Sequence, residues 1–216
     1  MLKYGFRKFK FESLHPLNID RQSLSNVPFK SKVLEIGCAT GLMGEYLIQK
    51  KRCHVTGVEQ RKDEAKQASK RLNRVVPGDI ENKNIYDKLG KFDVVLASSV
   101  IEHLKEPSQA LKNWKKLIKK KGLLIITTSN ITHWSIRTKI LKGNFEYQDY
   151  GILDNTHLHF YNIETFKKLV ENNGYIIEKF STDCVGGGYP KISNFLGKFL
   201  PNLFAYQILI VAKTGI

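Results

Sequence analysis

The sequence feature that most constrains the fold is an alternation of strand-like and helix-like segments that begins at Lys32. Short apolar runs rich in Val, Ile and Leu are separated by stretches in which apolar residues recur every three or four positions. A chain that alternates in this way places its strands parallel in one sheet, because each helix carries it back to the starting edge. We therefore predict an α/β fold, with helices on both faces of a mainly parallel sheet.

Seven strands and four connecting helices are expected from this pattern. The strands are predicted at 32–38, 54–59, 74–79, 92–99, 123–130, 175–182 and 205–213. The helices are predicted at 42–51, at 63–73, from Pro107 to a C-cap at Gly122, and from an N-cap at Asn162 to Gly174. The segment from His133 to Tyr161 interrupts the alternation, which is typical of an insertion that covers a substrate.

Composition indicates a globular chain that contains no disulfide scaffold. Hydrophobic residues make up 42% of the sequence, well above the level of disordered proteins. Three cysteines in no CxxC spacing favour reduced thiols over a disulfide framework or a zinc site. The N-terminus has no apolar leader, and no window reaches the roughly 18 apolar residues of a membrane span. We expect a cytoplasmic protein.

The formal net charge of +15 permits two interpretations. Such a charge attracts nucleic acid, anionic membranes and polyanionic substrates. Alternatively, the lysines are solvated helix faces, and the dense basic run 112–121 fits this interpretation. Charge alone therefore suggests partners and does not decide the fold.

The sharpest local signal is the sequence VLEIGCATGLMGEYL, in which Glu35, Gly37 and Gly41 lie where a strand turns into a helix. Glycines there allow the backbone to approach a ligand closely. A nicotinamide-binding loop would read GxGxxG, and the glycine spacing here does not match it. The Glu35 carboxylate would also repel a pyrophosphate, whereas it suits a ligand that carries an ammonium group.

This strand, acidic residue, G-x-G-x-G-like turn and helix resemble the first motif of class I S-adenosylmethionine-dependent methyltransferases, in particular the bacterial small-molecule type. Ala39 replaces the middle glycine, which makes a positive φ costly at that position. The resemblance implies a doubly wound, Rossmann-like, seven-stranded sheet with an antiparallel last strand. It also implies a methyltransferase domain at 32–216 with a substrate-cap insertion at about 131–161, preceded by a helical or extended segment, 1–31, that packs on the cofactor site.

The resemblance further implies the cofactor, S-adenosylmethionine, with S-adenosylhomocysteine as its product. Glu59 ends the second strand 22 residues after Gly37, where the family's acidic residue binds both ribose hydroxyls. Asp79 and Ile80 match the positions that contact the adenine, and ASSVIEHL matches the segment that closes over the methionine part. The implied cofactor-binding residues are Glu35, Gly37, Cys38, Gly41, Glu59, Gln60, Asp79, Ile80, Ser98 and Ser99.

Two histidines are candidates for a catalytic base. His157 is the first candidate and His103 the second, because imidazole can accept a proton from a hydroxyl acceptor near neutral pH. In an extended chain His157 and His159 point to the same side and could line an acceptor pocket, or they could simply hydrogen-bond the insertion to the body. A lone HxH without a third ligand does not indicate a metal site, and we expect none.

The function expected from these motifs is transfer of a methyl group to an oxygen or nitrogen of a small molecule or of a glycan or lipid precursor. The [DNS]PP[YF] sequence of nucleic-acid amino methyltransferases is absent. An RNA or protein methyltransferase remains an alternative, because of the charge and the aromatic and basic residues at 4–11. A cofactor-binding module without turnover is a third reading, supported by Ala39 alone. Oligomeric state is left open.

Overall fold

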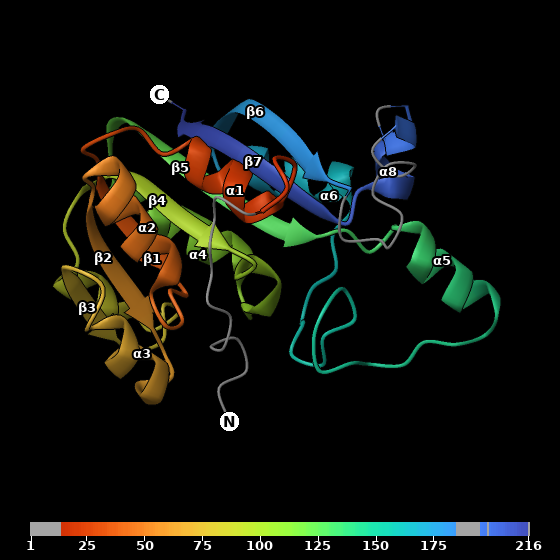
Figure 1. Cartoon of the computed structure of the whole chain (residues 1–216), viewed down its shortest axis with the longest axis horizontal. Coiled ribbons are helices and arrows are strands. Elements are labelled where there is room, and N and C mark those ends of the chain that lie inside the picture. Colours follow the sequence, from red (N-terminus) through yellow and green to blue (C-terminus); the bar gives the residue numbers. More distant parts are fainter. Residues whose placement is uncertain (1–13, 185–194, 198, 216) are drawn as a thin grey trace.

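A single seven-stranded sheet organises the chain, whose computed structural model describes residues 14–184, 195–197 and 199–215. The strand order is β3-β2-β1-β4-β5-β7-β6 (Figure 1). The first five strands are parallel, and β7 runs antiparallel to both of its neighbours, β5 and β6. The strands are β1 (Lys32–Ile36), β2 (His54–Glu59), β3 (Arg74–Pro77), β4 (Phe92–Ser98), β5 (Ile118–Ser129), β6 (Tyr175–Asp183) and β7 (Gln207–Thr214). The predicted fold class is confirmed.

Helices cover both faces of this sheet (Figure 1). They are α1 (Ile19–Ser25), α2 (Leu42–Lys51), α3 (Lys62–Ala68), α4 (Pro107–Leu117), α5 (Trp134–Leu141), α6 (Ile163–Asn172) and α8 (Pro201–Phe204), with 3-10 turns η2 (Lys83–Lys88) and η3 (Ile101–His103). One core contains buried residues of α4 and α6, and the other contains those of α1, α2, the end of α3 and the segment that follows α3. Alternate residues of each central strand therefore enter opposite cores.

The end of α4 differs from the prediction. The helix stops at Leu117 rather than at Gly122, because Ile118 pairs with Phe92 and begins β5. Gly122 lies inside β5, where an added Cβ would be 2.8 Å from the Asp93 carbonyl oxygen. Gly122 thus permits β4 and β5 to approach each other closely beside an irregularity in their register. The prediction that it caps the C-terminus of a helix is wrong.

Helix α3 is shorter than the predicted 63–73. It ends at Ala68, and the following turns lead to Asn73, whose side-chain oxygen accepts a hydrogen bond from the Val55 N–H at 2.8 Å. The Asn73 side chain therefore satisfies a backbone N–H at the start of β2, and the residue does not belong to a helix. By contrast, Asn162 caps α6 as predicted, through a capping box with Thr165.

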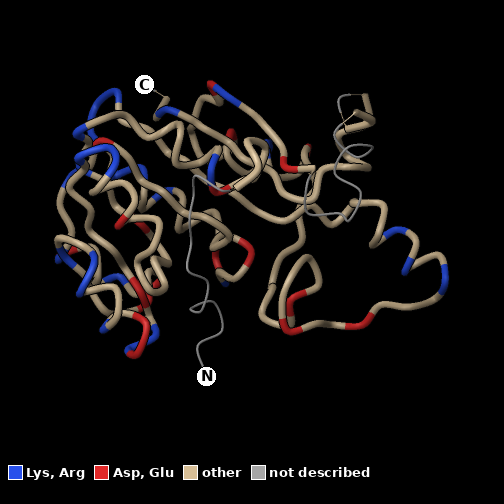
Figure 2. Tube along the Cα trace, viewed as in Figure 1, with Lys and Arg blue, Asp and Glu red and all other residues tan. Residues whose placement is uncertain are grey.

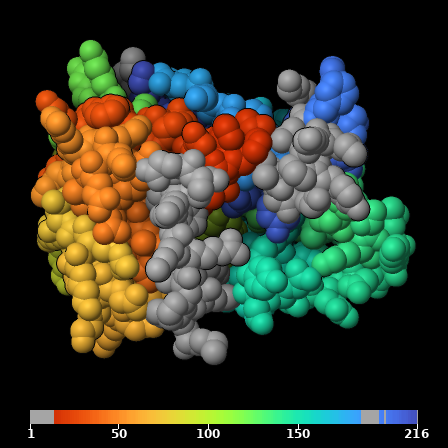
Figure 3. Space-filling model, viewed as in Figure 1, coloured from red at the N-terminus to blue at the C-terminus, as the bar shows by residue number. Residues whose placement is uncertain are grey.

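The insertion contains α5 and a long irregular segment that projects beside the carboxyl ends of the strands (Figure 1). In the space-filling view it forms a lobe, coloured green and teal (Figure 3). A small cluster of Ile136, Ile152 and Leu153 holds the insertion together. None of the helices in the described ranges has the length and apolar character needed to cross a membrane.

We predict that Gly44→Ala destabilises the fold, although alanine normally favours a helix by about 1 kcal/mol. An added Cβ would overlap Leu72 Cδ2 and Glu35 Oε2, so the net loss in free energy of unfolding should be about 1–2 kcal/mol. Urea denaturation measures it. Gln49→Ala, at an exposed position of the same helix, is the control and should change stability by less than about 0.5 kcal/mol. Equal effects of the two changes would contradict the packing argument.

Candidate active site

A cavity of about 750 Å³ opens at the carboxyl ends of β1, β2 and β4. The register of the parallel strands ends these three strands at one level, because Ile36 pairs with both Val58 and Ala97. Open α/β sheets bind ligands at such a point, where the strand order reverses direction. The order here reverses between β1 and β4, so the cavity lies where the topology favours binding.

The turn after β1 depends on small residues. Gly37 has φ +67°, and a Cβ on it would lie 2.6 Å from Val100 Cγ2. Gly41 has φ +83° and caps α2 without a side chain. Ala39 also adopts a left-handed conformation, with φ +46°, which costs a residue with a Cβ about 1–2 kcal/mol. The turn therefore has the shape of the glycine-rich motif despite the alanine.

The Glu59 carboxylate stabilises this turn through hydrogen bonds to the backbone. Its Oε2 accepts a hydrogen bond from the Ala39 N–H and its Oε1 accepts one from the Arg61 N–H, both at 2.9 Å. The carboxylate is buried and lies on the cavity wall. Two oxygens held by backbone donors present a fixed pair of acceptors, which suits vicinal hydroxyls.

Two further carboxyl groups, those of Glu35 and Asp20, line the same cavity. Burial raises the pKa of Glu35 to about 8, and the negative charges of Asp20 and Glu59 act in the same direction, against the Gly44 backbone. Burial likewise raises the pKa of Asp20, which accepts a 3.2 Å hydrogen bond from Ser98 Oγ. Glu35 Oε2 is buried and has no hydrogen-bond partner among the described residues. A cationic group bound here would satisfy it.

Nine of the ten sequence-predicted cofactor residues line this one cavity. They are Glu35, Gly37, Cys38, Glu59, Gln60, Asp79, Ile80, Ser98 and Ser99. Gly41 is the exception: it lies at the start of α2 and packs against Ala68, where an added Cβ would lie 3.1 Å from the Cα. Its part in the site is to begin the helix.

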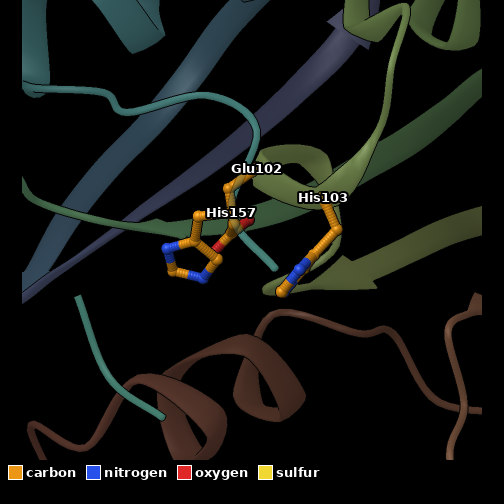
Figure 4. A group of neighbouring side chains, drawn as sticks. All are labelled: Glu102, His103 and His157. Atoms are coloured by element: carbon orange, nitrogen blue, oxygen red, sulfur yellow. The ribbon is translucent and has the colours of Figure 1, made fainter. Parts of the chain in front are cut away.

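In the same cavity, Glu102 and His103 of η3 meet His157 of the insertion (Figure 4). One ligand atom of each lies within 4.8 Å of the others. The Glu102 carbonyl oxygen accepts hydrogen bonds from the Leu158 and His159 N–H groups, at 2.8 and 3.1 Å. These backbone bonds hold the insertion against η3 and bring both histidines together.

Backbone carbonyls orient the two histidine rings. His157 Nδ1 lies 3.0 Å from the Ile152 oxygen, and His103 Nδ1 lies 3.2 Å from the Thr156 oxygen. A carbonyl can only accept, so Nδ1 carries the proton in each neutral ring and Nε2 has the lone pair. The rings meet edge to face, with their centroids 4.7 Å apart. Burial raises the pKa of Glu102, beside them, to about 7.

The two interpretations left open for His157 and His159 each apply to one of the two histidines. His157 is buried and lines the cavity. His159 does not line it, because the ring stacks on Tyr161 and its Nε2 approaches the Lys105 oxygen at 3.4 Å. The chain between them is held by the Glu102 carbonyl and does not continue as a regular strand.

The cavity is acidic although the chain is basic. Lysines and arginines are spread over separate helices and loops (Figure 2). Among the described residues that line the cavity, the only lysine or arginine side chains are those of Arg61 and Lys105, and two histidines, His103 and His157, are also present. The acidic ones are Asp20, Glu35, Glu59, Glu64, Asp79, Glu81, Glu102 and Asp154. This sign favours a cationic ligand and disfavours a polyanion at the inner wall.

Sequence reasoning missed Asp20 and Glu102. Asp20 lies before the first strand, outside every motif, and reaches the cavity because the Ile19 N–H donates to Asp183 Oδ2 and fixes α1 on the sheet. Glu102 precedes His103 directly, and a carboxyl beside a histidine just after an apolar strand is a signal that could have identified it. The aromatic and basic residues at 4–11 lie outside the described residues.

Comparisons with known proteins point to one family. Residues 9–179 match the family model of a methyltransferase domain. The chain is 30% identical over 135 residues to the ubiquinone biosynthesis O-methyltransferase of Glaesserella parasuis, covering 56% of this chain and 57% of that protein. It is 32% identical over 118 residues to the mitochondrial enzyme of that name from Saccharomyces cerevisiae, covering 51% and 38%. The aligned part is thus about half, or less, of each relative's length.

Solved structures share the fold. An S-adenosylmethionine-dependent methyltransferase from Thermotoga maritima superposes with a TM-score of 0.62 at 21% identity, over 90% of this chain and 86% of that one. The [4+2]-cyclase SpnF superposes with a TM-score of 0.64 at 14% identity, over 91% and 81%. A cyclase among the neighbours illustrates that this fold alone does not determine the reaction.

We predict that Glu35→Gln weakens the pH dependence of stability. Above its ordinary pKa of 4.5 the carboxyl is ionised in the unfolded chain, whereas the folded chain retains the proton up to about pH 8. The folded state therefore binds the extra proton, and the free energy of unfolding falls as pH rises through this window. Urea denaturation at pH 5 to 8 should show a shallower fall for the variant. The exposed Glu171→Gln is the control, and a wild-type slope in Glu35→Gln would oppose the assignment.

We predict that Ala39→Gly stabilises the protein. Glycine adopts φ +46° without the Cβ penalty, and its greater freedom in the unfolded chain offsets part of the gain. The expected increase in free energy of unfolding is about 0.5–1 kcal/mol. Ala65→Gly, inside α3, is the matched control and should lower stability by about 1 kcal/mol or more. A loss in both variants would show that the turn does not carry this strain.

Proposed function

Because the chain belongs to the methyltransferase-domain family whose model it matches, we propose that it transfers the methyl group of S-adenosylmethionine to an oxygen or nitrogen of a small molecule. The observation that carries this proposal is the convergence of Glu35, the Gly37 turn and Glu59 on one cavity. The curated relatives named above are O-methyltransferases, which favours oxygen. A cytoplasmic location remains a prediction.

The residues present fit the cofactor in three respects. A Cβ at Gly37 would collide with Val100, so the turn keeps space that a ligand can approach. Glu59 offers two fixed oxygen acceptors to ribose hydroxyls. A cation beside Glu35, with its orphaned Oε2, and Asp20 would lower the raised pKa values of both carboxyl groups, and the resulting carboxylates would suit the ammonium group and the sulfonium. Asp79 and Ile80 lie on the same wall, where the adenine is expected.

The cofactor supplies an activated methyl group and its own leaving group, so the protein mainly aligns the acceptor with it. Ser98 ends β4 and Ser99 follows it, and both line the cavity together with Glu35 and Glu102. In the same cavity, His157 and His103 present Nε2 lone pairs to an acceptor hydroxyl. We assign proton removal from the acceptor to this pair, with His157 as the more buried member.

The acidic cavity bears on the alternative substrates. A polyanionic RNA would bring phosphates near several carboxylates at the inner wall, which costs free energy. A neutral or cationic small acceptor meets no such repulsion. We therefore favour a small molecule over RNA. The module without turnover loses its one sequence argument, because Ala39 adopts the backbone conformation that a glycine would take there.

The decisive test is cofactor binding by titration calorimetry. We expect Glu59→Ala to lower the affinity for S-adenosylmethionine roughly 10–100-fold, the usual effect of losing hydrogen bonds to a charged group. Glu59→Gln, which keeps the size of the side chain, should also lose affinity while preserving more of the turn. Glu171→Ala, at an exposed site away from the cavity, is the control.

Wild-type affinity in both Glu59 variants, or absence of binding by the wild-type chain, would refute the proposed cofactor site. Once binding is established, formation of S-adenosylhomocysteine with panels of small phenols, alcohols and amines identifies the acceptor class. An RNA acceptor that outperforms every small molecule would instead support the alternative.

A further inference from the structure

The Glu102, His103 and His157 cluster contains three potential metal ligands, whereas a general base requires only one side chain. Two imidazoles and one carboxylate converge from two separate segments onto one wall of the cavity (Figure 4). Two histidines and a carboxylate with room for further ligands is the donor set of many divalent transition-metal sites.

The orientation of the rings matches what a metal ligand needs. Metal-binding histidines donate their second ring N–H to a carbonyl or carboxylate, which fixes the tautomer and turns the other nitrogen to the ion. Here the Ile152 and Thr156 carbonyls receive the Nδ1–H groups of His157 and His103. Thr156 is itself held by Asp154, through a 2.6 Å bond from its Oγ1. The surrounding groups thus orient both Nε2 atoms.

The carboxyl group of Glu102 provides an independent indication that this cluster can bind a cation. Its side chain is 1% exposed, and its Oε2 has no hydrogen-bond partner within the part of the chain that the structure describes. A buried carboxyl oxygen without a partner is costly unless a proton or a cation satisfies it. The neighbouring carboxyl of Asp154 increases this demand, because it adds negative charge.

We propose that Glu102, His103 and His157 form a binding site for a single divalent transition-metal ion, of the Zn²⁺, Mn²⁺ or Fe²⁺ class, at the acceptor end of the cavity. Imidazole nitrogen selects these ions over Mg²⁺ and Ca²⁺. Bonds of about 2.1 Å would place neighbouring ligand atoms roughly 3–3.5 Å apart, so the present spacing of up to 4.8 Å must contract. His103 is only half-buried and can move inward.

The metal site does not depend on the proposed function, whereas its catalytic use does. Three protein ligands leave positions on the ion open toward the cavity. A hydroxyl acceptor that coordinates there loses its proton to water more easily, because the ion stabilises the alkoxide or phenoxide. The acceptor oxygen then bonds to the methyl carbon as the carbon–sulfur bond breaks. In this arrangement the two histidines act by holding the ion, and this role replaces the direct proton removal assigned to them above, because a ring nitrogen bound to a metal cannot accept a proton.

The test uses the tag-free full chain, stripped with a chelator and titrated with Co²⁺, whose visible absorbance reports nitrogen and oxygen coordination. We expect one equivalent to bind at micromolar or lower concentration and to raise the melting temperature. His157→Ala, His103→Ala and Glu102→Gln should each weaken Co²⁺ binding about tenfold or more. His159→Ala is the matched control, because this histidine is next to the cluster and outside the cavity, and it should bind as wild type does.

S-adenosylmethionine binding is measured on the same stripped samples. Retained cofactor binding in the histidine variants shows that they are folded and separates the two proposals. Normal cofactor binding with no Co²⁺ binding, or with Co²⁺ binding that survives His157→Ala, overturns the metal site and leaves the histidines as a simple base. Loss of cofactor binding by the wild-type chain refutes the proposed function and leaves the metal result standing.

Discussion

The shared register of β1, β2 and β4 is the constraint on which the site depends. Parallel neighbours that end at one level release their following loops at the same edge, and helices on both faces leave only that edge open. Glu59, the last residue of β2, can therefore bond the turn after β1 with no intervening element. A one-residue shift in the register of β2 would turn this carboxylate to the opposite face of the sheet and remove it from the cavity wall.

Carboxyl groups at this edge of the sheet give the cavity its acidic character, and several of them have raised pKa values. Removing ionised groups from water is unfavourable, and the raised pKa values of Asp20, Glu35 and Glu102 express that cost. Lysine is abundant in this chain, yet no lysine neutralises Glu35 or Glu102 in the described residues. The fold thus keeps carboxyl groups where a cationic ligand would bind, and such a ligand would favour their ionised forms by lowering these pKa values.

Local signals made much of the fold predictable. Helix α2 and strand β2 begin and end where the sequence indicated, because Gly41 and Arg52 take left-handed conformations on either side of the helix and apolar residues fill β2. The end of α4 was not predictable in this way, since the helical spacing continues through Ile118. Pairing with Phe92 in β4 overrides that spacing, and such a contact is tertiary information.

The two halves of the cavity differ in the same way, because local sequence signals define one half and tertiary contacts define the other. The Glu35 and Glu59 half is built from one motif and the next strand, so residue types and spacing located it. The Glu102 half needs the insertion to return, and only the bonds from the 158 and 159 N–H groups to the Glu102 carbonyl place His157 beside it. The proposed acceptor end is therefore encoded in long-range backbone contacts. Because those contacts join η3 to an irregular insertion, we expect changes in the insertion to alter the proposed acceptor end while the Glu35 and Glu59 half stays constant.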